Sequence, residues 1–350
     1  MPGANRVHVD ISQYQEDDDK NYHYYYTTPD STTERIDVVV ELDPAEFPGY
    51  KRLTHKPRGS NIEIGGIEDG YEAMEEFMGL VPGCHSISVY YWMGGVMSFS
   101  PLIIQLNAIT NEYYKFNDST RRWDKTKSTE IAKDLITELD KQNCKRNTAH
   151  VVDISRKDDI SYRCYACNRK ITINLKNPGN SDPKYRKDIQ RVTDGDYIGR
   201  LKNGKGNIDN IIMKEEVSEL YIYGYPLEET KPLLLYIPPG DYGASSLNSG
   251  RWFKRASSTG NKWEQLDRNE PDGHENNEGI LSLLQQLSKE SQYFDPSEEE
   301  FEYYRSGVVA VGAVAAIAIV VLVGSSILGF IGCKLTPVTR NCPVSLHLRL

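Results

Sequence analysis

Two stretches of this sequence nearly repeat each other. Residues 7–12 read VHVDIS, and residues 150–155 read HVVDIS. Six common residues mean little by themselves, but further landmarks follow both stretches in the same order. VYYW at 89–92 is followed after eight residues by PLII, and LYIY at 220–223 is followed after eight residues by PLLL. This duplication constrains the fold most, because both copies must bury the same apolar positions.

Two further landmarks support the duplication. YYKFNDSTRRW, which ends at Trp123, matches WFKRASSTGNKW, which ends at Trp263. Each predicts two strands joined by a tight turn, with the Trp closing the hairpin by packing on the sheet. GYKRLTHKPRGSNIE from Gly49 also matches DYIGRLKNGKGNID from Asp196 in its Tyr, Arg-Leu and Asn-Ile-acid positions. Together these landmarks predict two copies of one domain.

Each copy is expected to end in an amphipathic helix. Apolar residues at helical spacing fall on one face, with charged residues on the other. They are Ile131, Leu135, Ile136 and Leu139 in the first copy, and Ile280, Leu283, Leu284 and Leu287 in the second. The rest of each copy consists of short strand-like runs separated by turn residues, without strand-helix-strand alternation. We therefore predict an α+β fold, mainly antiparallel β, built from two tandem repeats that each end in one helix.

A membrane anchor is expected after the repeats. The 27 residues of 307–333 carry no charge and exceed the about 20 residues that a transmembrane helix needs. The predicted organisation is as follows: a first β-rich repeat domain at 1–148, a second at 149–294, an acidic stalk at 295–306, a C-terminal transmembrane helix at 307–333 and a short basic tail at 334–350.

The side of the membrane is left open by two conflicting signals. The first twenty residues contain no apolar stretch of a secretory signal, which favours domains that face the cytosol. The basic residues Lys334, Arg340 and Arg349 after the span favour a cytosolic tail instead. Asn117 begins an Asn-Asp-Ser glycosylation sequon, which matters only if the domain is lumenal.

No constellation for catalysis is visible. The formal net charge is −9 and no basic run with interleaved aromatics occurs, which argues against a nucleic-acid binder. The segment GRLKNGKG at 199–206 approaches a phosphate-cradling motif, but Gly206 stands where Ser or Thr should follow the Lys. We interpret it as a turn. His8 and His150 belong to the repeated stretch and are expected to be structural. We predict no catalytic residue and no cofactor.

Four cysteines lie outside the membrane region: Cys84, Cys144, Cys164 and Cys167. Cys164 and Cys167 form a lone C-x-x-C, and a zinc site would need a second pair of ligands. No nearby C-x-x-C or H-x-x-x-H supplies one, so we predict no metal ligand. In a lumenal or exterior location the four allow three disulfide pairings, and in the cytosol they are free thiols. Cys333, at the membrane boundary, is a candidate for acylation.

Several strings carry a family resemblance. FPGYKRLTHKP, SISVYYW with the following PLIIQL, EYYKFNDSTRRW, and LDKQNC with the following HVVDIS resemble the expanded family of uncharacterised proteins of piroplasmid parasites, Theileria equi in particular. Members are tandem copies of this kind of unit, often with a C-terminal membrane span. The resemblance implies surface display, secretion or host-cell interaction, and it carries over no catalytic residue.

These observations predict a single-pass membrane-anchored, non-catalytic binding or host-interaction protein of an apicomplexan parasite. Its expected partner is a host or parasite protein. The alternative is a tail-anchored adaptor or scaffold that faces the cytosol. The ligand and the oligomeric state are not fixed by the sequence.

Overall fold

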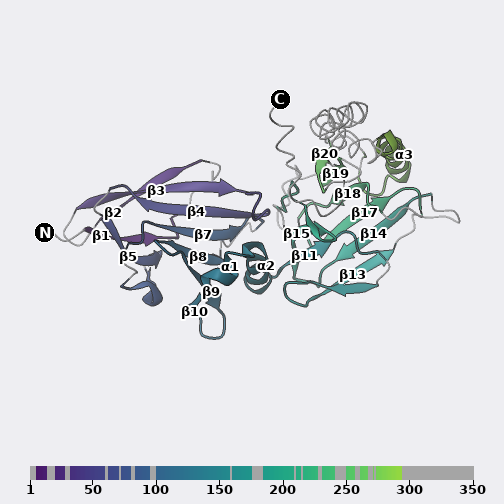
Figure 1. Cartoon of the computed structure of the whole chain (residues 1–350). Coiled ribbons are helices and arrows are strands. Elements are labelled where there is room, and N and C mark those ends of the chain that lie inside the picture. Colours follow the sequence, from purple (N-terminus) through teal and green to yellow (C-terminus); the bar gives the residue numbers. More distant parts are fainter. Residues whose placement is uncertain are drawn as a thin grey trace, which may run out of the picture. The chain divides into compact units, whose positions relative to one another are not determined.

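A computed structural model gives the fold (Figure 1). The structure describes residues 5–13, 20–27, 32–59, 62–70, 72–79, 83–94, 100–157, 160–175, 184–208, 210–213, 216–227, 231–240, 250–256, 261–266, 271 and 273–293. Within these residues, no helix combines the length and apolar character that crossing a membrane requires. The predicted stalk, span and tail, together with Cys333, lie outside the described residues.

A seven-stranded antiparallel sheet forms the centre of the first repeat, in the order β10-β9-β8-β7-β4-β3-β2. Its strands are β2 Tyr22–Thr27, β3 Thr33–Leu42, β4 Tyr50–Pro57, β7 Ser86–Trp92, β8 Ile103–Asn107, β9 Glu112–Asn117 and β10 Arg122–Thr126. A smaller sheet, β1-β5-β6, consists of β1 Asn5–Asp10, β5 Ile62–Asp69 and β6 Glu72–Ala73. The 3-10 turn η1 spans Glu75–Phe77.

The second repeat has the same two sheets in the same strand order, with each strand number raised by ten. The seven-stranded sheet contains β12 Ser161–Arg163, β13 Lys170–Leu175, β14 Arg186–Arg191, β17 Glu219–Gly224, β18 Leu234–Ile237, β19 Arg251–Arg255 and β20 Trp263–Gln265. The smaller sheet contains β11 Ala149–Asp153, β15 Tyr197–Asn203 and β16 Gly206–Asn207. The matching sheet pairs agree with the predicted β-rich repeats.

The smaller sheets contain a parallel pair that the sequence did not predict. β1 runs parallel to β5, and β11 runs parallel to β15. Both parallel pairs contain one register shift. It falls between Val7 and His8 in β1 and between His150 and Val151 in β11, in each case three residues before the end of the strand. This shared irregularity aligns Asp10 with Asp153, and therefore aligns Val7 with His150.

Each repeat has three layers. The smaller sheet packs on one face of the larger sheet through an aliphatic core, in which Trp123 and Trp263 close their hairpins as predicted. A terminal helix packs on the other face. In the second repeat this helix is α3 Asn277–Tyr293, whose Ile280, Leu284 and Leu287 bury against aromatic side chains of the sheet. Amphipathic periodicity therefore identified the helix face correctly.

The terminal helix of the first repeat is divided. α1 spans Ser128–Ile131 and α2 spans Leu135–Arg146, whereas the apolar spacing suggested one continuous helix. Asp134 breaks the run because its backbone is not helical and its carboxylate accepts the N–H of Thr137, which caps α2. Ile131 and Leu139 still reach the same core.

One predicted landmark was wrong. Gly49 precedes β4, a strand of the seven-stranded sheet, whereas Asp196 precedes β15, a strand of the smaller sheet. The two segments share residues but not position, and β4 corresponds to β14. The contacts also place both repeats in one compact unit, Met1–Lys289, and the remaining unit is Glu290–Leu350.

Candidate metal centre

Three cysteines and one histidine meet where the repeats join. Cys144 lies on α2, His150 on β11, and Cys164 and Cys167 on the hairpin between β12 and β13. One ligand atom from each lies within 4.8 Å of the ligand atoms of all the others. α2 belongs to the first repeat and lies against β11 and β15 of the second (Figure 1). The group thus joins side chains of both repeats.

Two distances within the group are close to those between the ligand atoms of a zinc site. The Sγ atoms of Cys144 and Cys164 are 3.7 Å apart, and Cys167 Sγ lies 3.2 Å from His150 Nδ1. Zn–S bonds of about 2.3 Å at tetrahedral angles place two sulfurs about 3.8 Å apart. A disulfide would require about 2.05 Å. All of the described cysteines, including Cys84, are free thiols.

Burial and mutual hydrogen bonding perturb these groups strongly. Hydrogen bonds with Cys144 and Cys167 lower the pKa of the Cys164 thiol far below its ordinary value, although burial opposes this. The hydrogen bond with Cys164 raises the pKa of Cys144 correspondingly. Burial disfavours the His150 cation, but interactions with Cys164, Cys167 and Asp196 outweigh it and raise the pKa of His150 to about 10. These shifts place the negative charge on Cys164 and keep protons on Cys144 and His150, which a metal ion would have to displace on binding.

The hairpin that carries the C-x-x-C is closed by its own backbone. The N–H of Asn168 donates to the carbonyl of Cys164, and the N–H of Cys164 donates to the carbonyl of Arg169, both at 2.8 Å. Asn168 adopts a left-handed conformation with φ of 67°, which Asn tolerates well. The backbone N–H of Val151 bonds to the Cys164 sulfur. These contacts hold the hairpin in which the sulfurs of Cys164 and Cys167 lie close to Cys144 and His150.

A carboxylate supports the histidine from behind. His150 Nε2 lies 3.1 Å from Asp196 Oδ2, in an ion-pair contact, while Nδ1 faces the cysteines. Arg169 Nε lies 3.9 Å from the same carboxylate oxygen. Metal-binding histidines commonly donate their second ring nitrogen to a carboxylate, which fixes the tautomer and the ring orientation. Asp196 lies at the right distance for that role, although Nε2 and Oδ2 form an ion-pair contact and not a hydrogen bond.

The first repeat lacks this arrangement. The shared irregularity of the parallel ladders places Val7 where the second repeat has His150, and Val7 is fully buried in the core. The hydroxyls of Tyr24 and Tyr162 accept the backbone N–H groups of Asp10 and Asp153 at matching places, so Tyr26 takes the place of Cys164. The ligand set is therefore an addition to the second copy and is not required by the fold.

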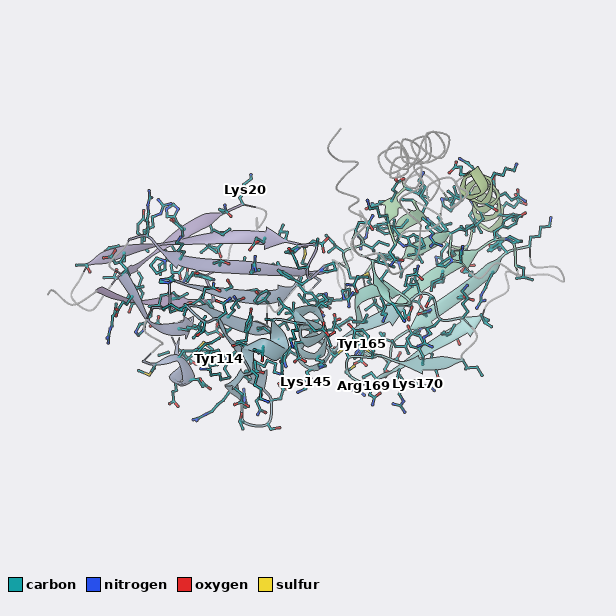
Figure 2. All side chains as sticks on the ribbon, in the orientation of Figure 1. Lys20, Tyr114, Lys145, Tyr165, Arg169 and Lys170 are labelled. Atoms are coloured by element: carbon teal, nitrogen blue, oxygen red, sulfur yellow. The ribbon has the colours of Figure 1, made fainter. Side chains whose placement is uncertain are left out.

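A buried ion pair lies beside the metal centre. Arg200 of β15 donates Nε to Asp140 Oδ1 at 3.0 Å and Nη2 to Asp140 Oδ2 at 2.6 Å. Asp140 lies on α2 and is fully buried. Tyr50 of β4 donates its hydroxyl to the same carboxylate at 2.6 Å. Tyr165, next to α2 in Figure 2, also donates to it. Both repeats therefore meet in one polar network.

All three cysteines of the candidate metal centre were predicted from the sequence as disulfide-forming or free thiols, but their position together with His150 was not predicted. Cys84 lies apart, in the first repeat, where burial raises its pKa to about 11. Cys144 and His150 were not grouped with the C-x-x-C pair because they form no second paired motif and lie on different elements. The segment 199–206 is the turn that we predicted, since β15 and β16 pair across it.

Comparison with protein-family models, with curated proteins and with solved structures finds no match for this chain. The fold and the site define a class of protein: two tandem β-rich repeats joined beside a closed set of three cysteines and one histidine.

Proposed function

We propose that this chain is a non-catalytic, membrane-anchored adaptor whose two repeats are held as one body by a structural zinc ion. The observation that carries the proposal is the convergence of Cys144, His150, Cys164 and Cys167 at the joint. Three thiolates and an imidazole in tetrahedral arrangement suit zinc best among common cellular metals. Such a centre fixes the orientation in which the repeats present their surfaces to a partner protein.

A structural role fits the closure of the site. Catalytic zinc keeps one position for water or substrate, whereas structural zinc has four protein ligands. Here four protein ligands are available, and Cys144, His150 and Cys164 are each buried. Cys167 is partly exposed, but four protein ligands leave no coordination position for a substrate, and this supports a structural role for the metal.

The purified full chain is expected to contain one zinc ion per molecule. Replacing His150 with valine, the residue that the first repeat has at this place, should remove most of the bound zinc while leaving a side chain that the fold accommodates. Elemental analysis after desalting measures this. His8→Val, in the matching strand of the first repeat, is the control and should retain its zinc. A folded wild-type chain without metal would contradict the proposal.

The reduced state of the ligands favours the cytosolic side. Zinc-binding thiolates persist in compartments that keep cysteines reduced, and cysteine patterns there are more often metal-binding than disulfide-forming. We therefore favour the adaptor that faces the cytosol over a protein displayed on the exterior of an apicomplexan parasite. The apolar segment 307–333 supplies the proposed anchor, and the family resemblance to piroplasmid proteins supports the repeat organisation.

A topology experiment separates these two locations. In cells that express the full chain with an N-terminal tag, protease added after selective permeabilisation of the plasma membrane should destroy the tag. The sequon at Asn117 should stay unmodified, so treatment with an endoglycosidase should not change the electrophoretic mobility. Asn117→Gln is the matched control for mobility. A protected tag with a glycosylated Asn117 would place the repeats in the lumen and overturn the cytosolic assignment.

A further inference from the structure

A basic pocket lies at the end of β11 in the second repeat, on the turn that joins β15 and β16. The cavity has a volume of about 560 Å³. Four basic side chains line it, together with a single carboxylate: Arg156, Lys157, Lys202, Lys205 and Asp153. Such a concentration of positive charge does not follow from composition, because the chain carries a formal net charge of −9.

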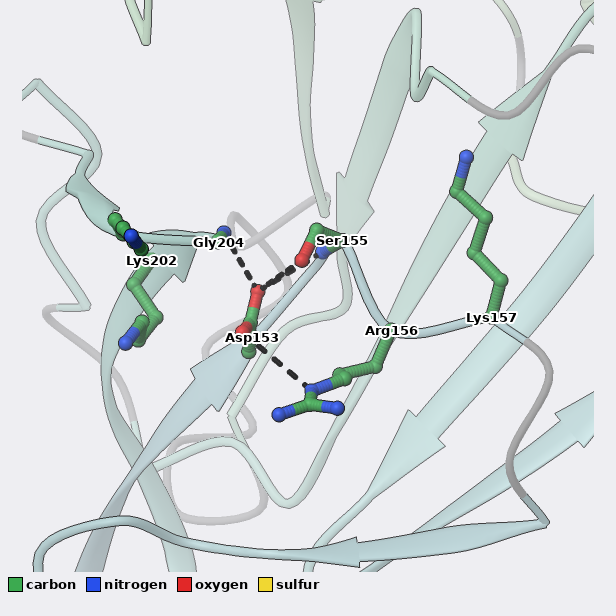
Figure 3. A pocket seen from close by; sticks show the side chains of 7 residues that line it. Asp153, Ser155, Arg156, Lys157, Lys202 and Gly204 are labelled. Carbon is green, nitrogen blue, oxygen red and sulfur yellow. Dashed lines mark hydrogen bonds and ion pairs between the residues drawn. The ribbon is translucent and has the colours of Figure 1, made fainter.

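The carboxylate in this pocket is already engaged. Asp153 Oδ1 accepts the backbone N–H of Ser155 at 3.1 Å and the hydroxyl of Ser155 at 2.7 Å. It also accepts the backbone N–H of Gly204 at 2.9 Å. Asp153 Oδ2 lies 3.7 Å from Nε of Arg156. Figure 3 shows Asp153 between the Ser155–Arg156 segment and the turn at Gly204. Asp153 therefore fixes the loops of the pocket, and the excess charge presented to a ligand is positive.

The first repeat builds the same turn without the positive charge. Asp10 accepts the N–H and hydroxyl of Ser12 and the N–H of Gly70, as Asp153 does with its counterparts. Gly70 and Gly204 both have positive φ, 69° and 61°. The scaffold of the turn is thus common to both copies.

The residues at the four basic positions differ between the copies. Counting from the shared aspartate and glycine, the first repeat has Gln13 for Arg156, Tyr14 for Lys157, Glu68 for Lys202 and Tyr71 for Lys205. Among the described residues, Gln13 and Glu68 show that a neutral and an acidic side chain are compatible with this turn. Arg156 and Lys202 also lie over the rings of Tyr162 and Tyr165, and binding of an anion accounts for the gathering of all four basic residues at one pocket.

We propose that this pocket binds a small ligand that carries two or more phosphate or sulfate groups. Guanidinium and ammonium groups form charge-assisted hydrogen bonds with tetrahedral oxyanions. The cavity lies within the size range of small-molecule sites, about 300–1,000 Å³. Recognition is by side chains rather than by a phosphate-cradling loop, because the turn after β15 leads into β16 and not into a helix. This binding activity is separate from the proposed zinc centre.

Calorimetric titration of the zinc-loaded full chain tests this proposal with two probes, inositol hexakisphosphate and sucrose octasulfate. We expect saturable binding of at least one probe with one site per chain, weakening as salt concentration rises. The preferred probe identifies the source of the oxyanion as a phosphate or a sulfate ester. Failure of both probes to bind would overturn the proposal.

The decisive variant gives the pocket the residues of the first copy. Arg156→Gln combined with Lys202→Glu should lower the affinity about tenfold or more, since two charge-assisted contacts are lost or reversed. Its circular dichroism spectrum and its unfolding midpoint should stay close to those of wild type, which shows that it folds. Arg122→Gln with Lys127→Glu changes the net charge equally on an exposed part of the first repeat and should leave the affinity within about twofold of wild type. Equal loss in both variants, or in neither, would refute a specific pocket.

Discussion

Cys144→Ser is expected to abolish stoichiometric zinc binding and to lower the free energy of unfolding by about 5 kcal/mol or more. Structural zinc contributes about 10–16 kcal/mol to the folding of small zinc-finger peptides, and three remaining ligands retain only part of that. A loss of this size approaches the whole stability of a typical domain, about 5–15 kcal/mol. Denaturant unfolding at a fixed free zinc concentration measures it.

Cys84→Ser is the matched control, because Cys84 is also a buried free thiol but lies outside the ligand set. Burying a hydroxyl there costs about 1–3 kcal/mol without any dependence on zinc. A strong chelator should therefore lower the unfolding midpoint of wild type and of Cys84→Ser, and should leave that of Cys144→Ser unchanged. If the chelator had no effect on wild type, the zinc centre would be refuted.

The position of Cys144 would make the proposed zinc ion a link between the repeats. Cys144 belongs to α2, which packs on the sheet of the first repeat through Leu139, while the other three ligands belong to the second repeat. Metal binding therefore constrains the relative orientation of two sheets that share no strand. An adaptor that presents two surfaces at once benefits from such a constraint, since less conformational freedom is lost on binding a partner.

The layers of each repeat could be predicted from the sequence because their signals are local. Apolar periodicity marked the face of α3 that packs on the sheet, and the two Trp-terminated hairpins lie where they were expected. The parallel pairing of β1 with β5 could not be predicted in the same way. This pairing joins segments more than fifty residues apart in the sequence. The sequence of a short strand does not determine which other strand it will pair with.

The metal centre was hidden for the same physical reason. Its candidate ligands come from α2, β11 and the β12–β13 hairpin. Cys144 and His150 therefore form no recognisable motif in the sequence beside the C-x-x-C pair. One signal was present in the opening repeat of the sequence. VHVDIS and HVVDIS are aligned by their aspartates, so His150 replaces the buried Val7. A polar side chain at a core position of one copy alone indicates a local partner, here three thiols.

Loss of the salt bridge between Asp140 and Arg200, beside the candidate zinc centre, is the second change that we expect to lower stability strongly. Asp140→Ala should lower the free energy of unfolding by about 3–5 kcal/mol, because it leaves the guanidinium of Arg200 buried without its counter-charge. Arg200 is only 2% exposed, and Tyr50 also loses the acceptor of its hydroxyl. The same unfolding measurement at saturating zinc isolates this contribution from that of the metal.

Two comparisons make this result specific to the joint between the repeats. Glu75→Ala removes an exposed pair with Arg122 in the first repeat and should cost less than about 1 kcal/mol. Asp140→Leu combined with Arg200→Met removes both buried charges and should recover much of the stability lost in Asp140→Ala. Recovery should stay incomplete, since the hydroxyls of Tyr50 and Tyr165 still lack the carboxylate. If Asp140→Ala cost no more than Glu75→Ala, the two repeats would not be coupled through this pair, and zinc would be left as their main link.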